Sequence, residues 1–243
     1  MDIGSQTVLI TGGASGIGWA LAQRFVAAGS DVILCGRRAD KLADAARQHR
    51  QIQTRVCDVA RESERIALAE WIAREQPRVN VLVNNAGIQN RLAVDPGNWS
   101  AARQELAINL EAPIHLSMLL AAELARRPNP AIVNVTSGLA FVALAEMPVY
   151  CASKAALHSF TMSLRRQLAQ TPVQVIEIIP PAVDTDLGGP GLHKFGVPLD
   201  EFADAVMTRL AAGDLEIAYG FAERLMRATR QELDEIFAQQ NPR

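Results

Sequence analysis

The most constraining feature of the sequence is a glycine-rich turn that follows a short apolar run near the beginning of the chain. Residues 7–11 read T-V-L-I-T, which is typical of a buried strand, and residues 11–18 read T-G-G-A-S-G-I-G. From Ile17 the apolar residues recur at helical spacing until Gly29. Bare backbone can approach a pyrophosphate closely, and a helix N-terminus offers free N–H groups and partial positive charge. The context predicts a dinucleotide-binding turn with Gly12, Gly16 and Gly18; a glycine-rich turn without a ligand is the alternative.

Strand-like and helix-like segments alternate along the rest of the chain. The expected strands are apolar runs near 7–11, 31–36, 52–57, 79–84, 131–136, 173–179 and 215–219. The expected helices lie near 17–28, 39–49, 61–76, 98–126 and 149–170, from 199, and near 221–240. Continuous apolar strands that alternate with helices are typical of a parallel sheet covered on both faces. We therefore predict an α/β fold, a Rossmann-type doubly wound parallel sheet of about seven strands in a single domain over 1–243; a (β/α)₈ barrel is the rival.

Composition and charge narrow the possible partners. Hydrophobic residues make up 49% of the chain, charged residues 21%, and the formal net charge is -2. Since nucleic-acid-binding domains tend to be basic, we expect no nucleic-acid partner. Cys35, Cys57 and Cys151 show no C-x-x-C spacing, so we expect neither a disulfide framework nor a metal site. Without a signal-like start or a long apolar stretch, we expect no membrane association and a cytoplasmic location.

The end of the second expected strand carries the residues that should read the adenosine ribose. In this architecture an acidic residue about 20 positions beyond the glycine turn binds the 2′-hydroxyl of NAD. Here Gly36 is followed by Arg37 and Arg38, and Asp31 stands too early in the strand. Guanidinium groups suit a phosphate dianion, so the sequence favours NADP, with NAD as the alternative cofactor. A simpler interpretation is that the two exposed arginines only begin a helix. Asp58 is placed to accept from the adenine amino group.

A second group of polar residues follows the later strands. Tyr150 and Lys154 stand four residues apart at a helix start and therefore share one face. A nearby ammonium favours the phenolate and makes a tyrosine a better acid–base. Ser137 and the N-N-A-G run at 84–87 each end a strand, where ligands bind in parallel sheets. Asn109 lies within an apolar helical run and, taken alone, is a structural asparagine.

Together these motifs resemble the short-chain dehydrogenase/reductase family over about residues 5–220. The resemblance rests on T-G-x-x-x-G-I-G, N-N-A-G, Asn109, Ser137, and Tyr150 with Lys154, in the family's order and spacing. The C-terminal half is similar to the DltE-type oxidoreductases of that family. The resemblance implies an NADP(H)- or NAD(H)-dependent oxidoreductase that transfers a hydride between nicotinamide and a carbonyl or secondary alcohol of a small, partly apolar substrate.

The resemblance also implies roles for individual residues. Tyr150 is the general acid in reduction and the base in oxidation, and Lys154 lowers its pKa and holds the nicotinamide ribose. Ser137 orients the carbonyl, and Asn109 holds a water that links Lys154 to solvent. The expected cofactor contacts are Gly12, Ser15, Gly16, Ile17, Gly18, Arg37, Arg38, Asp58, Val59, Asn85, Ala86, Gly87, Tyr150, Lys154, Val183 and Thr185.

The sequence departs from the family pattern after the sixth expected strand. Pro180-Pro181 stands where the family has Pro-Gly, so the loop near the nicotinamide should be stiffer. We expect a short substrate lid at about 186–198. Arg91, His193 and Lys194 offer charge for an anionic substrate, and solvated loop charges are at least as good an interpretation.

Two expectations concern assembly and activity. The helices expected at 98–126 and 149–170 carry more apolar residues than one sheet face can cover, and relatives pair these helices across a dyad. We therefore expect a homo-oligomer, a tetramer or a dimer. The alternative to an enzyme is a non-catalytic NAD(P)-binding sensor or scaffold. Loss of Tyr150 or Lys154 would indicate such a protein, and both residues are present.

Overall fold

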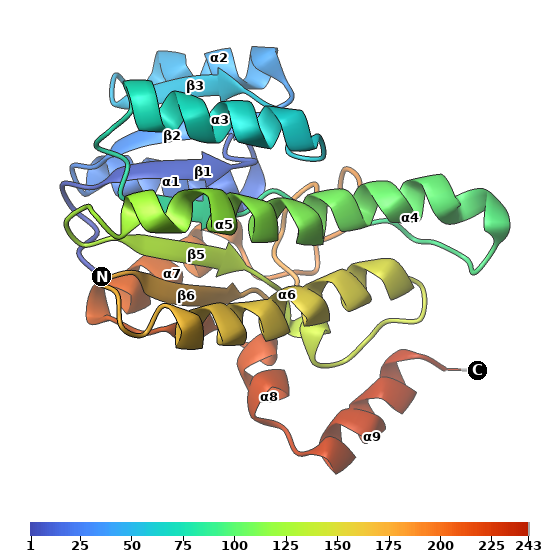
Figure 1. Cartoon of the computed structure of the whole chain (residues 1–243). Helices are drawn as coiled ribbons and strands as arrows, with labels where there is room; N and C mark the ends of the chain where they lie inside the picture. Colours follow the sequence, from blue (N-terminus) through green and yellow to red (C-terminus); the bar gives the residue numbers. More distant parts are fainter. Residues whose placement is uncertain (243) are drawn as a thin grey trace.

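A computed structural model of the chain describes residues 1–242 and shows a seven-stranded sheet between two layers of helices (Figure 1). The strands are β1 (Thr7–Thr11), β2 (Asp31–Gly36), β3 (Ile52–Val56), β4 (Val81–Asn84), β5 (Ala131–Val135), β6 (Gln174–Ile179) and β7 (Glu216–Ala218). They follow the order β3-β2-β1-β4-β5-β6-β7, and every pairing is parallel. The predicted doubly wound sheet is confirmed.

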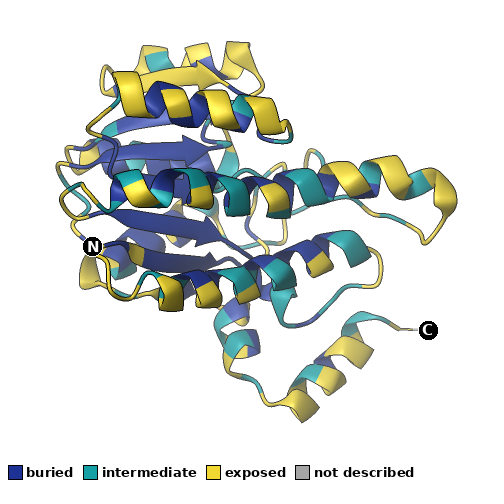
Figure 2. Cartoon of the chain, in the orientation of Figure 1, coloured by how far each residue is buried: buried dark blue, intermediate teal, exposed yellow. Residues whose placement is uncertain are grey.

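The helices cover both faces of the sheet. They are α1 (Gly16–Ala27), α2 (Ala39–Gln48), α3 (Glu62–Glu75), α4 (Trp99–Leu106), α5 (Ala112–Leu124), α6 (Pro148–Gln167), α7 (Leu199–Ala212), α8 (Phe221–Arg227) and α9 (Arg230–Gln240). One apolar core joins α1, α2 and α7 to the sheet, and the other joins α3, α5 and α6 to the opposite face. Figure 2 shows the central strands as the most buried part of the chain, whereas the edge strand β3 is largely exposed.

Alternating side chains of the central strands contribute to both cores. Val8 and Ile10 of β1 point to the α1 side, and Leu9 between them points to the α5 side. All three are fully buried. Apolar side chains are needed at consecutive positions because both faces of the sheet are covered, which explains the uninterrupted apolar runs in the sequence.

The long helix expected at 98–126 is interrupted. A 3₁₀ turn (Pro96–Asn98) precedes α4, and a π-helical segment (Ala107–Glu111) separates α4 from α5. In Figure 1, α4, the π-helical segment and α5 form one continuous rod. Pro113 near the start of α5 supplies no backbone N–H to the carbonyl four residues earlier, that of Asn109. The wider π turn accommodates this missing donor at the position of Asn109.

The C-terminal helix expected at 221–240 is two helices. α8 ends at Arg227 and α9 begins at Arg230, with Thr229 as the N-cap of α9. Thr229 and Glu232 form a reciprocal capping box, which defines a new helix start. The prediction of a single helix was wrong because this T-x-x-E signal was overlooked. α8 and α9 reach away from the sheet below α6 (Figure 1).

The described residues contain neither a membrane-spanning helix nor a metal-binding cluster. None of their helices combines the length and hydropathy needed to span a bilayer. Nor do residues 1–242 gather His, Cys, Asp or Glu into a group that could hold a metal ion.

Candidate active site

The carboxyl ends of β1 and β4 lie side by side where the strand order reverses, and this is where the two glycine-containing motifs meet. The Thr11 hydroxyl accepts from the backbone N–H groups of Asn85 and Ala86, both at 3.0 Å. The Asn85 side-chain amide donates to the Thr11 carbonyl at 2.9 Å. These bonds tie the N-N-A-G segment to the first residue of the glycine turn.

The glycine turn has the shape of a cradle that side chains would fill. Gly12 has φ +62°, and a Cβ there would lie 2.9 Å from Ala86 Cα. Gly16 also has positive φ, and a Cβ there would approach Thr185. A Cβ on Gly18 would lie 2.7 Å from the Gly12 carbonyl oxygen. The turn therefore requires glycine, and with the N-terminus of α1 behind it, it fits a bound pyrophosphate.

One cavity of about 1160 Å³ runs from this turn to the residues beside α6. Fifteen of the sixteen expected cofactor contacts line it together with Ser137. They are Gly12, Ser15, Gly16, Ile17, Arg37, Arg38, Asp58, Val59, Asn85, Ala86, Gly87, Tyr150, Lys154, Val183 and Thr185. Gly18 packs beneath the turn, and Asn109 lies behind the loop that follows β4, so neither lines the cavity.

The adenosine end of the cavity carries two guanidinium groups. Arg37 and Arg38 are exposed and line the cavity next to the glycine turn. The Arg38 guanidinium donates to the Ser15 hydroxyl at 2.9 Å. The carboxylate of Asp58 accepts from the backbone N–H of Ala60 at 3.1 Å. A cation and a hydroxyl held together at this position match the chemistry of a ribose phosphate.

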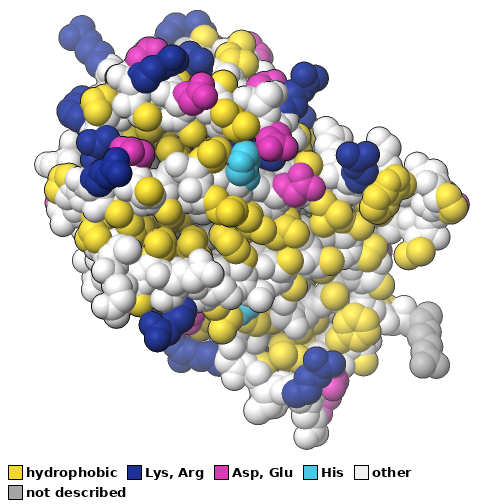
Figure 3. Space-filling view, viewed as in Figure 1, with side chains coloured by type: hydrophobic (Ala, Val, Ile, Leu, Met, Phe, Trp, Pro, Cys, Tyr) yellow, Lys and Arg dark blue, Asp and Glu magenta, His cyan; other side chains and the backbone are white. Residues whose placement is uncertain are grey.

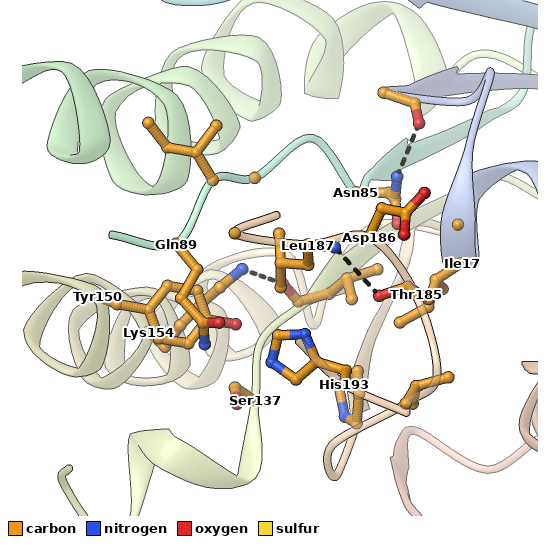
Figure 4. Close-up of a pocket in the computed structure, with 18 of the residues that line it drawn as sticks. Ile17, Asn85, Gln89, Ser137, Tyr150, Lys154, Thr185, Asp186, Leu187 and His193 are labelled. Carbon is orange, nitrogen blue, oxygen red and sulfur yellow. Dashed lines mark hydrogen bonds between the residues drawn. The ribbon is translucent and has the colours of Figure 1, made fainter. Parts of the chain in front are cut away.

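At the other end of the cavity, α6 presents Tyr150 and Lys154 toward Ser137. Tyr150 is 5% exposed and Lys154 is 4% exposed. The Lys154 ammonium donates to the Val135 carbonyl at 2.9 Å, at the end of β5. Figure 4 shows these side chains beside Gln89, with Leu187 and His193 coming from the loop after β6. The four-residue spacing places phenol and ammonium on one face of the helix, as the sequence indicates.

Burial dominates the protonation of this group. Removal from water raises the pKa of the Tyr150 phenol far above its ordinary value, and hydrogen bonding with the Ser137 side chain lowers it. Burial lowers the pKa of the Lys154 ammonium to about 8, while the negative charge of Glu105 raises it. Neither group therefore has its solution proton affinity.

Asn109 lies in the π-helical segment, with its amide facing the loop after β4. Its Nδ2 donates to the Ile88 carbonyl at 2.8 Å, and its Oδ1 accepts from the Ile88 N–H at 2.9 Å. A Cβ placed on Gly87 would lie 3.4 Å from Asn109 Oδ1 and 3.7 Å from Lys154 Nζ. Asn109 and Lys154 thus approach the same glycine from two helices, and the wider π turn occurs at this asparagine.

Sequence reasoning missed two residues near the site, Glu105 and Asn241. Glu105 is a fully buried carboxylate next to this group. The amide of Asn241, at the end of α9, donates to the Ala143 carbonyl and accepts from the Ala145 N–H, in the loop before α6. The helical position of Glu105, four residues before Asn109, was a signal that could have been used; nothing local marks Asn241.

The charged residues expected to meet an anion are arranged differently. Arg91 pairs with Glu146 at 3.3 Å between Nη1 and Oε2. Lys194 is exposed, whereas His193 lines the cavity. Because Arg91 is already paired, the case for an anionic substrate is weaker than the sequence implied.

Comparisons with known proteins agree with this arrangement. A family model described as short chain dehydrogenase matches residues 6–193. The chain is 46% identical over 248 residues to a Bacillus subtilis (strain 168) protein named uncharacterized oxidoreductase DltE, with 99% of this chain and 98% of that protein covered. A short chain dehydrogenase from Burkholderia cenocepacia J2315 in complex with NADP superposes with a TM-score of 0.85 at 28% identity, covering 98% and 99% of the two chains. A short-chain dehydrogenase from Sphingobium yanoikuyae in complex with NADPH gives 0.82 at 26% identity, covering 95% of each chain.

Proposed function

The chain belongs to the short-chain dehydrogenase family and is an oxidoreductase of the CH–OH/C=O class, and from this we propose that it transfers a hydride between NADP(H) and a small, partly apolar carbonyl compound or secondary alcohol. The observation that carries the proposal is the cluster of Ser137, Tyr150 and Lys154, buried at one end of the cavity whose other end is the glycine turn. A cofactor stretched along the cavity would bring its nicotinamide to this cluster.

Each residue of the cluster has a separate task in the proposed reaction. The bound nicotinamide supplies or accepts the hydride. The Tyr150 hydroxyl donates its proton to the substrate oxygen in reduction and recovers it in oxidation. Ser137 hydrogen-bonds the same oxygen and supports the charge that develops on it. Lys154 places its ammonium 5.7 Å from the centre of the Tyr150 ring, where a positive charge would stabilise the phenolate.

The choice of NADP over NAD rests on the arginines that follow β2. Arg37 and Arg38 stand where an acidic residue would bind the ribose hydroxyls of NAD. The Arg38–Ser15 bond shows that a guanidinium reaches the rim of the glycine turn. The relatives from Burkholderia cenocepacia and Sphingobium yanoikuyae bind NADP and NADPH respectively. These points support NADP as the preferred cofactor.

The surroundings of Tyr150 support a substrate with an apolar body. Tyr150 and Met147 pack with Leu139, Leu144 and Leu187, three partly buried side chains that also line the cavity. Apolar walls around a few polar groups are typical of small-molecule sites. Since the cation of Arg91 is paired with Glu146, a neutral substrate fits this end of the cavity better than an anion.

The decisive experiment combines a substrate panel with one substitution. Ketones, aldehydes and alcohols are tested with NADPH, NADH and their oxidised forms, following the absorbance of the reduced nicotinamide. Tyr150→Phe should keep cofactor affinity and lose about 10²–10⁴-fold in kcat, because it removes only the transferable proton. A Tyr150→Phe variant with wild-type kcat would refute the assignment. Cofactor binding with no turnover on any substrate would favour a sensor.

Assembly into a homo-oligomer is part of the proposal. Met118 on α5 and Met162 on α6 are 70% and 52% exposed. Figure 3 shows hydrophobic side chains gathered on the face that these two helices present. An exposed apolar face on neighbouring helices supports a two-fold interface between copies of the chain. A cytoplasmic location also stays a prediction; the three cysteines, all unpaired, fit a reducing compartment.

A further inference from the structure

Glu105 is a buried acid that the proposed reaction does not use. It lies near the end of α4, one helical turn before Asn109, and its exposed fraction is zero. Its Oε1 accepts from the backbone N–H of Asn90 at 3.0 Å. Its Oε2 is buried and has no hydrogen-bond partner in the part of the chain that the structure describes. A buried carboxylate with half of its capacity unused is costly and calls for an explanation.

Glu105 and Asn109 act on the same short peptide. Asn109 hydrogen-bonds both the N–H and the carbonyl of Ile88. Glu105 accepts from the backbone N–H of Asn90, two residues further along. Between them lies Gln89, whose side chain enters the cavity next to Tyr150 (Figure 4). Two successive turns of one helix therefore fix the segment that carries Gln89 to the substrate end of the cavity.

The unused oxygen belongs to a carboxylate that interacts with the catalytic face of α6. α4 packs against α6, and the negative charge of Glu105 acts on three ionisable groups there: Lys154, Tyr150 and Cys151. From the loop after β4, Asn90 faces Glu105 with an uncharged N–H. Lys154 is therefore the cation that the carboxylate faces, and its ammonium also approaches Gly87, in the same loop.

We propose that Glu105 is a positioning residue of the active site, whose carboxylate fixes the Ile88–Asn90 peptide and holds a buried negative charge against the Lys154 ammonium. The structural role of Glu105 does not depend on the proposed function; only the effect of Glu105 on turnover rests on it. The charge of Glu105 favours protonated Lys154 and protonated Tyr150, so both pKa values fall when the charge is removed. Glu105→Gln removes the charge and retains an oxygen for Asn90.

The test is a lysine titration that needs neither substrate nor cofactor. Lys41, Lys154 and Lys194 are the three lysines of the chain, so Lys41→Arg/Lys194→Arg leaves a single lysine. Carbon-13 NMR of its ε-methylene group then reports Lys154 alone, starting from a pKa of about 8. In this background Glu105→Gln should lower the midpoint by roughly one pH unit. Glu111→Gln is the matched control, because Glu111 is exposed six residues further along the same rod; it should leave the midpoint unchanged.

Two further measurements complete the test. Glu105→Asp keeps the negative charge and should keep the midpoint within about a few tenths of a pH unit. With a substrate in hand, Glu105→Gln should move the pH limb of kcat in the same direction as the lysine midpoint. An unmoved Lys154 midpoint in Glu105→Gln overturns the proposal, even if the wild type turns over. If Glu105→Gln does not fold, a displaced midpoint in Glu105→Asp overturns it. Absence of turnover in the wild type refutes the proposed function and leaves the titration result standing.

Discussion

Replacing Lys154 with methionine should abolish turnover and change how the stability of the protein depends on pH. The ammonium of Lys154 is buried, with 4% exposure. Burial lowers its pKa from an ordinary 10.5 to about 8. Below about pH 8 the lysine is charged in both the folded and the unfolded chain, and folding pays the full cost of burying the charge. Between about pH 8 and 10.5 the folded state releases its proton first, so that cost disappears as the pH rises.

The magnitude follows from the size of the pKa change. Each pKa unit corresponds to about 1.4 kcal/mol, so the fall from 10.5 to about 8 makes the folded wild type less stable by about 3 kcal/mol at pH 7 than at pH 10.5. Lys154→Met cannot titrate and lacks this dependence. At any single pH the comparison also includes the lost hydrogen bond to Val135 and the lost attraction to Glu105. These contributions do not depend on the ionisation of Lys154 alone, so we follow how the difference in unfolding free energy between wild type and Lys154→Met changes with pH. That change isolates the ionisation of Lys154.

The assay is urea unfolding of the cofactor-free protein at several pH values between 7 and 10. The difference in unfolding free energy between wild type and Lys154→Met should shift in favour of the wild type by about 2–3 kcal/mol across this range. Lys194→Met serves as the control, because Lys194 is exposed and its removal should give a constant difference. A constant difference for Lys154→Met as well would show that Lys154 is not a buried charge with a lowered pKa.

Three other predictions concern cofactor choice, pH and assembly. Arg37→Asp should reduce the preference for NADP over NAD, measured as the ratio of kcat/KM values, by about 10–100-fold, as expected for the loss of 1–3 kcal/mol of phosphate pairing; equal wild-type values would remove the basis for the prediction. Glu177 raises the pKa of His158 through their 2.9 Å pair, so this pair should stabilise the fold most below about pH 6.5 and less as the pH rises through the folded-state pKa of His158. His158→Gln should therefore cost more stability at acidic than at alkaline pH in urea unfolding, and an equal cost would contradict it. Light scattering should give two or four times the 26.3 kDa of the chain, and charges at Met118 and Met162 should reduce that mass; a fully active wild-type monomer would refute the interface.

The architecture could be predicted from the sequence because the central strands are apolar at consecutive positions. Leu9 and Ile10, for example, must each face a different core, which only a sheet covered on both sides provides. The glycine turn was equally informative, since Gly12 and Gly18 leave no room for a side chain. Motif spacing also brought Ser137, Tyr150 and Lys154 to one end of one cavity. Local patterns sufficed here because each motif directly follows a strand, and parallel strands end at a common edge.

The remaining features depend on contacts that sequence spacing does not encode. Pro113 identifies a disturbance in the helix, but whether it produces a kink, a break or a π turn depends on the packing around Asn109. Arg91 looked like a free cation until the fold placed Glu146 beside it, 55 positions along the chain. Asn241 likewise gains its partners only because α9 folds back to the loop before α6. Pairings of this kind are consequences of the tertiary structure.

Lys154 and Glu105 are both buried at this end of the cavity, and their burial explains why the site costs stability. An apolar residue at position 154 would avoid the cost of burying an ammonium, and one at 105 would avoid the cost of a carboxylate with an unpaired oxygen. Each charge lowers the free-energy cost of burying the other, because each favours the charged form of its partner. Removing either one should therefore be worse for the fold at neutral pH than the separate burial costs suggest, and removing both should recover part of the loss. A double variant, Glu105→Met with Lys154→Met, that is as unstable as the sum of the single variants would show that the two charges do not interact.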